Sequence, residues 1–128
     1  MKIDVKEWQT QSDYDFNTAK AMFESGRYIY SVFMCHLSIE KALKGLFAEL
    51  TESLPPKSHN LIYFVDKLTL EPPKEIDKFI TILNDQGVVT RYPESLENLI
   101  SVFTKARTDL IIKQTDGALK WIKLQSKI

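Results

Sequence analysis

Prolines divide this 128-residue chain into segments with a helical repeat. All five prolines fall at three places, and between these places the apolar residues recur every three or four positions. That spacing is the period of an amphipathic α-helix, and no segment alternates apolar and polar residues as a half-buried strand does. Because proline lacks a backbone N–H and clashes with the preceding turn, each proline site interrupts a helix. The sequence therefore predicts an all-α fold, a single domain over residues 1–128, arranged as an antiparallel up-and-down bundle of about five helices.

The turn and cap residues set the expected helix boundaries. Helices are expected over residues 5–25, 27–51, 74–86 and 99–125, with a short third helix after Ser58 that uses apolar residues from Leu61 to Leu68, and a loop over residues 87–98. Gly26 is placed to end the first helix, because glycine adopts the left-handed cap conformation cheaply. Ser58 is the expected N-cap of the third. The second helix is apolar all round, which predicts a central position. The expected inward ridge of the last helix is Phe103, Ala106, Leu110, Gly117, Trp121 and Leu124.

Charge and cysteine content restrict the classes of partner and compartment. Seventeen basic residues balance seventeen acidic ones, so any contact with phosphate has to come from a local cluster rather than from bulk attraction. A single cysteine, Cys35, allows no internal disulfide. The first eight residues lack the apolar core of a signal peptide. Charged side chains interrupt the longest apolar stretch, residues 28–50, so no membrane span is expected and the protein is expected to be cytoplasmic.

A polar stripe runs along the otherwise apolar second helix. His36, Glu40 and Lys44 are four residues apart and so lie on one helix face. Polar groups on a buried helix cost free energy unless they are paired or hydrated. One explanation is structural: the stripe is a solvated face on which Glu40 pairs with Lys44. The other is that the stripe lines a cleft, where Lys44 meets a phosphate and Glu40 holds the lysine or an arginine in place.

The connector after the first proline pair could bring a histidine to this stripe. Ser58 and His59 follow Pro55-Pro56, and His59 is expected in the first turn of the third helix. Backbone N–H groups and the positive end of the helix dipole favour an anion there. The alternative is that His59 only packs or caps the helix.

A second connector contains Arg91, Tyr92 and Pro93. An arginine fixed in a loop by a following Tyr-Pro is suited to bidentate recognition of a phosphate or carboxylate. The alternative is an ion pair of Arg91 with Glu40 or with Glu94, which would tie the loop to the bundle.

Other kinds of site have little support in the sequence. The chain has two histidines and no Glu-x-x-His pair, so a di-metal bundle site is not expected. It has no glycine-rich phosphate loop, and no cofactor is expected. Cys35 lies on the apolar side of its helix and is interpreted as a small core residue rather than a nucleophile.

Three motifs resemble, in their order and spacing, those of a known protein family. They are Glu-Lys-Ala-Leu-Lys at residues 40–44, Pro-Pro-x-Ser-His-Asn-Leu at residues 55–61 and Arg-Tyr-Pro at residues 91–93. Further matching positions are Asp15, Phe16, Ala19, Gly26, Tyr28, Ala118, Trp121 and Ile122. These residues extend over nearly the whole chain, which on this basis resembles the HEPN family.

The resemblance implies a five-helix bundle, often a homodimer, from bacteria or archaea. Members of the family are frequently encoded beside a small nucleotidyltransferase, in toxin–antitoxin or defence settings. Several branches are metal-independent RNases that use an arginine followed, four to six residues later, by a histidine on a late helix.

This chain departs from the RNase branches. Its arginines are Arg27, Arg91 and Arg107, and neither histidine lies four to six residues after any of them. The chain is instead similar to the branch with Ser-His-Asn-Leu and Arg-Tyr-Pro motifs, for which the resemblance implies nucleotide binding. Because the arginine–histidine motif of the RNase branches is absent, ribonuclease activity is not predicted. Whether the chain catalyses any reaction stays open.

Three functions remain as hypotheses. The first is a nucleotide- or RNA-related binding module that works with a separate nucleotidyltransferase, with a phosphate site formed by Lys44, Glu40, His36, Ser58, His59, Arg91 and Tyr92. The second is a metal-independent RNase toxin with a rearranged site, in which His59 is the general base and Arg91 stabilises the developing charge. The third is a purely structural dimerisation module. The first two require the polar side chains to meet in one place, and the third predicts that they are spread apart.

Overall fold

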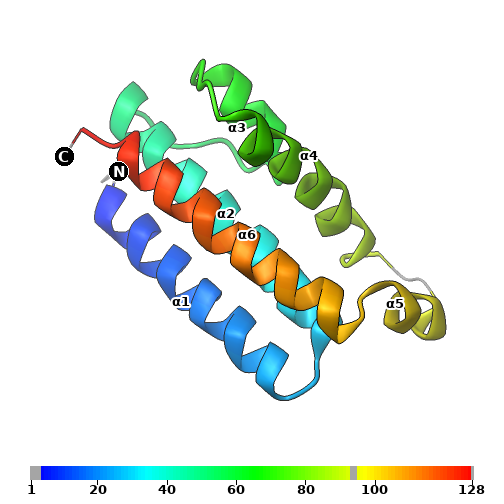
Figure 1. Cartoon of the computed structure of the whole chain (residues 1–128). Coiled ribbons are helices and arrows are strands. Elements are labelled where there is room, and N and C mark those ends of the chain that lie inside the picture. The colour runs from blue at the N-terminus through cyan, green and yellow to red at the C-terminus, as the bar shows by residue number, and fades with distance from the viewer. Residues whose placement is uncertain (1–3, 93–94, 128) are drawn as a thin grey trace.

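The computed structural model describes residues 4–92 and 95–127, and over these residues the chain forms helices and no strands (Figure 1). The all-α prediction is confirmed. The helices are α1 (Val5–Glu24), α2 (Tyr28–Thr51), α3 (Leu61–Lys67), α4 (Lys74–Val89), α5 (Leu96–Val102) and α6 (Lys105–Leu124).

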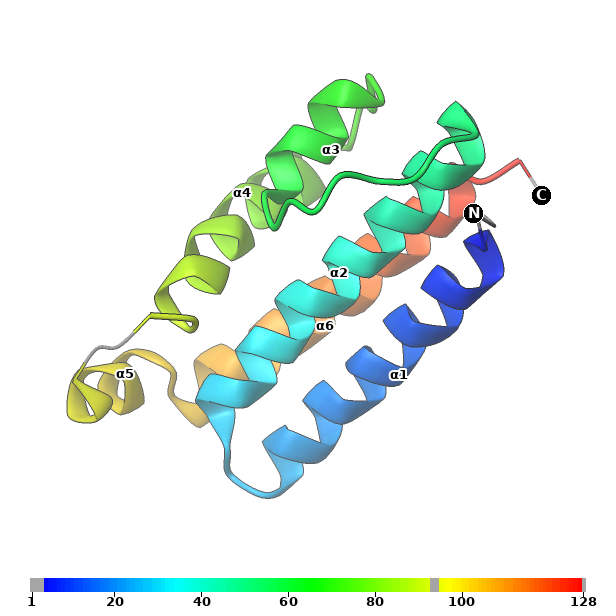
Figure 2. The same cartoon turned by 180° about the vertical axis from the view of Figure 1, so that it is seen from behind.

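Four helices form an up-and-down bundle with α2 at its centre. The helices α1, α2, α4 and α6 lie side by side with successive directions reversed, and both chain ends lie at the same end of the bundle (Figure 1). Helix α2 contacts every other helix. The connector after α2 runs back along that helix before α3 begins (Figure 2). This return path carries the residues before α3 to the middle of α2.

Local capping explains where the helices begin and end. The Asp4 side chain accepts a hydrogen bond from the Glu7 backbone N–H at the start of α1, and Gly26 adopts a positive φ of 79° in the turn after it. The prediction that Ser58 caps α3 is wrong. Asn60 is the cap, because its side chain accepts from the Tyr63 N–H, whereas Ser58 accepts from the N–H of Asn60. His59 therefore precedes the helix rather than lying in its first turn.

The C-terminal third differs most from the sequence prediction. Helix α4 continues through Gly87 to Val89, and part of the predicted loop forms the short helix α5. Ser95 and Thr104 cap α5 and α6 with their side chains, so the predicted last helix is broken before residue 105. The break shifts the buried face of α6: Phe103 is buried as predicted, but Ala106, Leu110, Gly117 and Leu124 are exposed.

Aliphatic and aromatic side chains from all the long helices fill the core. The largest fully buried apolar side chains are Phe64, Phe103, Ile39, Leu43, Leu61, Ile80 and Leu83. Cys35 belongs to this core, and burial raises the pKa of its thiol to about 12, so it is protonated and has the character of a small apolar side chain. Within the described residues, no helix is both long and apolar enough to span a membrane.

The polar stripe of α2 is buried, unlike an ordinary solvated helix face. The exposed fractions of His36, Glu40 and Lys44 are 1%, 3% and 7%. The solvated-face explanation is therefore wrong. Helix α4 approaches this stripe closely at Gly87, where the backbone packs directly against the His36 ring.

We predict that two glycines within helices, Gly87 of α4 and Gly117 of α6, respond in opposite ways to substitution by alanine. A methyl group at Gly87 would overlap the His36 imidazole, whereas one at Gly117 meets no atom within 4 Å. Gly87→Ala is expected to lower the free energy of unfolding by about 1 to 3 kcal/mol through overpacking. Gly117→Ala is expected to raise it by up to about 1 kcal/mol, because alanine favours helix. Urea denaturation measures both values, and stabilisation by Gly87→Ala would contradict the close approach of α4 to α2.

Candidate functional site

The site is centred on the buried carboxylate of Glu40, which four basic side chains surround. Lys44 Nζ lies 3.1 Å from Oε2, and Arg91 Nη2 lies 3.4 Å from Oε1. His59 Nδ1 lies 3.1 Å from each carboxylate oxygen. His36 Nδ1 is farther away, at 3.7 Å from Oε1. The structure thus brings together residues from the middle of α2 and from two connectors that are distant in sequence.

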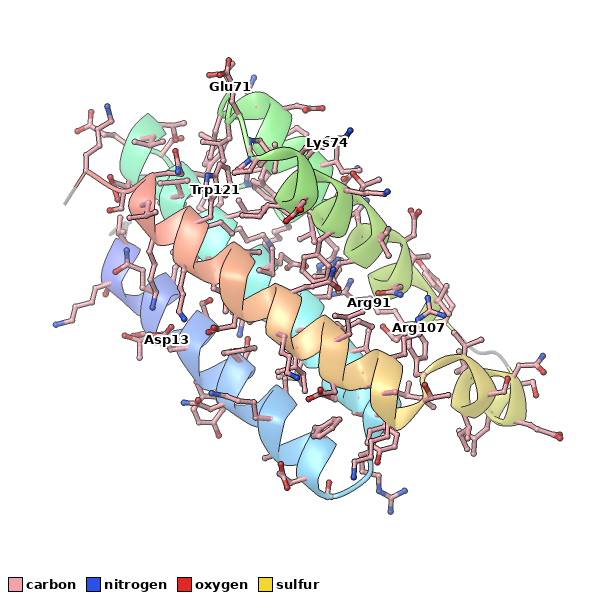
Figure 3. All side chains as sticks on the ribbon, in the orientation of Figure 1. Asp13, Glu71, Lys74, Arg91, Arg107 and Trp121 are labelled. Carbon is pink, nitrogen blue, oxygen red and sulfur yellow. The ribbon has the colours of Figure 1, made fainter. Side chains whose placement is uncertain are left out.

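Three elements position these side chains. The four-residue spacing on α2 places Glu40 between His36 and Lys44 on one face. The returning connector presents His59 immediately before α3, and Arg91 follows the end of α4. In Figure 3 Arg91 lies between the end of α4 and the long helices of the bundle. The site is therefore formed only when α3 and α4 pack onto α2.

Positive charge exceeds negative charge around Glu40. Lys44 and Arg91 carry one positive charge each against the single negative charge of Glu40, which leaves one positive charge before any protonation of His59. Both cations also lie over aromatic rings: the Arg91 guanidinium is 5.0 Å from the centre of the Phe33 ring, and Lys44 Nζ is 5.8 Å from that of Trp8. These contacts fix the direction of the side chains without neutralising them.

The carboxylate stays ionised despite its burial. Burial on its own would raise the pKa of Glu40, but the hydrogen bond from His59 and the charge and hydrogen bond of Lys44 outweigh it and hold that pKa below its usual value. An ionised carboxylate accepts hydrogen bonds and donates none. His59 Nδ1 must therefore carry the proton of this contact, which leaves Nε2 as the ring nitrogen not bonded to Glu40.

His36 is a neutral group behind the carboxylate. Burial, with the charges of Arg91 and His59 adding to it, lowers the pKa of His36 to about 4, although Glu40 opposes the shift. Neither ring nitrogen has a hydrogen-bond partner among the described residues. The ring fills the space between α2 and Gly87, so it supports Glu40 from beneath rather than reaching the surface.

A surface pocket of about 180 Å³ opens over the connectors. Its lining residues are His59, Asn60, Asn84, Val88, Arg91 and Tyr92. The side chain of His59 is 63% exposed and that of Arg91 is 20% exposed, so these two basic groups connect the buried carboxylate to the pocket. Lys44, Glu40 and His36 lie beneath it. Ser58 does not line it, and its hydroxyl instead accepts the backbone N–H of Asn60.

Sequence reasoning missed Asn84 as a lining residue. Asn84 is on α4, and its side-chain oxygen accepts the backbone N–H of Leu61 at 2.8 Å, which ties α4 to the start of α3. An asparagine on a helix carries no sequence signal that distinguishes it from an ordinary surface residue. Pro93 and Glu94 lie outside the described residues, and with them the alternative pairing of Arg91 with Glu94.

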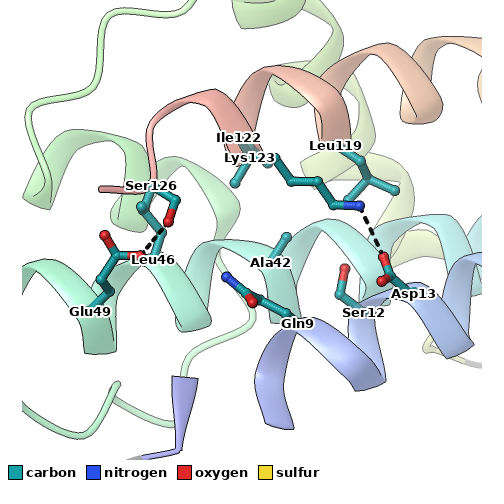
Figure 4. Close-up of a pocket in the computed structure, with 10 residues that line it drawn as sticks. All are labelled: Gln9, Ser12, Asp13, Ala42, Leu46, Glu49, Leu119, Ile122, Lys123 and Ser126. Atoms are coloured by element: carbon teal, nitrogen blue, oxygen red, sulfur yellow. Dashed lines mark hydrogen bonds and ion pairs between the residues drawn. The ribbon is translucent and has the colours of Figure 1, made fainter. Parts of the chain in front are cut away.

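A second hollow, between α1, α2 and α6, is too small to be a ligand site (Figure 4). Its volume is about 20 Å³, roughly the space for one water molecule. Its charged side chains already have partners: Lys123 pairs with Asp13 at 3.4 Å, and Glu49 accepts from Ser126 at 2.6 Å. Among the described residues no cluster of side chains is suited to hold a metal ion.

We predict that His36 makes the stability of the fold depend on pH. Its pKa is about 6.5 in an unfolded chain and about 4 in the folded protein. Between these values the unfolded state binds a proton that the folded state does not, so the free energy of unfolding rises with pH from 4 to 6.5. His36→Leu is expected to remove about 3 kcal/mol of this rise, measured by denaturation at several pH values. His59→Ala, which keeps the buried ring, should retain it. An unchanged pH profile in His36→Leu would contradict the neutral buried state.

Comparison with known proteins assigns the family. The HEPN domain family matches residues 5–125. An archaeal HEPN homologue, ST0689, has 26% sequence identity and a TM-score of 0.77, with 98% of each chain covered. The protein TT1696 from Thermus thermophilus has 16% identity and a TM-score of 0.81, covering 98% of this chain and all of the other, and this likeness concerns the fold. No curated protein matches the sequence. The chain belongs to the HEPN domain family.

Proposed function

We propose that this HEPN domain binds a phosphate-bearing ligand, a nucleotide or RNA, at the pocket over Glu40. HEPN domains are a family of nucleotide- and RNA-related modules. The observation that carries the proposal is the unbalanced charge: a lysine, an arginine and a histidine meet around one carboxylate, beside an open pocket. A chain with no net charge attracts phosphate only where it concentrates positive charge in this way.

Each side chain has a distinct role in this proposal. Arg91 contacts the phosphate, because its guanidinium lines the pocket and presents several donors in a rigid plane. His59 is the second contact. Glu40 holds both in place, and Lys44 offsets the negative charge of Glu40 from below, so that the carboxylate does not repel the ligand. A structural dimerisation module has no need for these residues to converge, which favours ligand binding.

The biological setting forms part of the same proposal. The family resemblance supports a prokaryotic, cytoplasmic protein that works with a small nucleotidyltransferase in a toxin–antitoxin or defence system. It also supports a homodimer. Apolar side chains exposed on and near α5 offer a surface for such contacts: Tyr30 is 61% exposed, Leu96 64% and Ile100 58%. Co-purification with the nucleotidyltransferase and sedimentation analysis test the two partners separately.

A second candidate function, RNA cleavage, is favoured by the contact between Glu40 and His59. A carboxylate that accepts from Nδ1 leaves Nε2 to take a proton, as a general base requires. Arg91 would stabilise the charge that develops on the phosphate. Incubation of the purified protein with a mixed RNA pool tests this candidate. It requires cleavage that disappears in His59→Ala, and RNA that stays intact would exclude it.

We predict that nucleotide affinity depends on Arg91 and not on arginine content in general. Arg91→Ala is expected to weaken the binding of ATP and of a short RNA by about ten- to a hundredfold, because it removes charge-assisted hydrogen bonds. Isothermal titration calorimetry measures this loss. Arg27→Ala is the matched control, because Arg27 precedes α2 and lines a different pocket. The proposal fails if neither ligand binds to the native protein, or if the two variants bind equally well.

A further inference from the structure

The pocket over Glu40 has two asparagines whose acceptor atoms are already used. Asn84 Oδ1 accepts the Leu61 N–H at 2.8 Å, and Asn60 Oδ1 accepts the Tyr63 N–H at 3.2 Å. A backbone N–H can meet only the oxygen end of a carboxamide, so these contacts fix the orientation of both side chains. The oxygen of each asparagine is thus turned toward a backbone N–H, and its NH2 group is left to bond to a ligand. Among the described residues, no acceptor bonds to either of these groups.

The two basic residues of the pocket add further donors. The Arg91 guanidinium has donors and no acceptor. His59 has its Nδ1–H bound to Glu40, which leaves Nε2 as the ring nitrogen available to a ligand. Tyr92 also lines the pocket, and its hydroxyl can donate. The polar side chains thus converge mainly as hydrogen-bond donors, which match a ligand group made of acceptors alone.

We propose that this pocket is a subsite for a phosphate monoester, with Asn60 and Asn84 as ligands beside His59 and Arg91. This inference rests on the proposed function and specifies the group that is bound. A monoester has three terminal oxygens and up to two negative charges, whereas a diester has two terminal oxygens and one charge. The donors of Asn60, Asn84, Arg91 and Tyr92 and an excess positive charge suit the monoester better. The group is the terminal phosphate of a mononucleotide or of an RNA end.

The size of the pocket agrees with a single phosphoryl group. Its volume of about 180 Å³ is below the range of about 300 to 1,000 Å³ that is usual for pockets enclosing a whole small ligand. The nucleoside or the remaining RNA would then extend out of the pocket, past Tyr92, whose side chain is 66% exposed. Selectivity at this subsite therefore comes from the phosphate and not from the base.

A comparison of AMP with cyclic AMP and adenosine tests the inference, because the base and the sugar stay the same. AMP is expected to bind at least about tenfold more tightly than cyclic AMP, and adenosine to bind weakest. A short RNA with a 5′-phosphate, compared with the same RNA ending in a 5′-hydroxyl, distinguishes an RNA end from a mononucleotide as the source. Equal affinity of AMP and cyclic AMP, and of the two RNAs, overturns the inference.

Asparagine-to-aspartate variants test the individual donors. Asn84→Asp keeps an oxygen for the Leu61 N–H and replaces the NH2 group by a second, negatively charged oxygen. It is expected to weaken AMP binding by about ten- to a hundredfold with little change in helix content by circular dichroism. Asn60→Asp preserves the α3 cap in the same way and gives a second, independent test. The control is Asn17→Asp, an identical change at an exposed position of α1.

The results separate the two levels of the proposal. If ATP, RNA and AMP all fail to bind, the proposed function itself fails. If they bind through Arg91, but AMP is not preferred to cyclic AMP and the 5′-phosphate RNA is not preferred to the 5′-hydroxyl RNA, only the monoester subsite is wrong. Unchanged AMP affinity in folded Asn84→Asp and Asn60→Asp would also overturn the role of the asparagines.

Discussion

The buried carboxylate of Glu40 is the constraint on which the arrangement of this domain depends. An ionised group at the centre of a helical bundle is tolerated only when charge and hydrogen bonds compensate for its lost hydration. Lys44 supplies part of this compensation from the same helix, and His59 and Arg91 supply the rest from connectors. Closing the fold and assembling the site are therefore a single event, because the carboxylate is fully compensated only when α3 and α4 are packed on α2.

The same compensation gives the site its chemistry. More basic side chains surround Glu40 than are needed to balance its one negative charge. Two of them, His59 and Arg91, also line an open pocket. His36, held neutral by burial beneath Glu40, adds bulk without adding charge. Asn84 ties α4 to the start of α3 through its side-chain oxygen, and it also lines the pocket. The hydrogen bonds that His59, Arg91 and Asn84 make within the protein thus hold in place the side chains that line the pocket. Recognition of an anion requires such preorganised donors.

Sequence patterns predicted the helices and indicated which side chains needed a partner, because both follow from local periodicity. The four-residue spacing of His36, Glu40 and Lys44 on an apolar helix indicated one polar face, but it left open whether that face is solvated or lines a cleft. The position of Asn84 depends on how α4 packs against α3, and no local pattern encodes that. Helix α5 was missed because seven residues with no buried side chain give almost no periodic signal. Helix α6 begins only after the Thr104 cap, and a different side of it from the predicted one faces the core. Leu110 is therefore exposed rather than buried.

The stability of Glu40→Gln, with and without inorganic phosphate, tests the central claim most directly. Without the carboxylate, Lys44 and Arg91 lose their anionic partner, and the free energy of unfolding should fall by about 3 to 5 kcal/mol. Added phosphate should then restore part of this loss, and should stabilise the variant more than it stabilises the native protein, because the uncompensated cations bind the added anion. A variant as stable as the native protein, and indifferent to phosphate, would show that Glu40 neither holds the fold together nor balances an anion site.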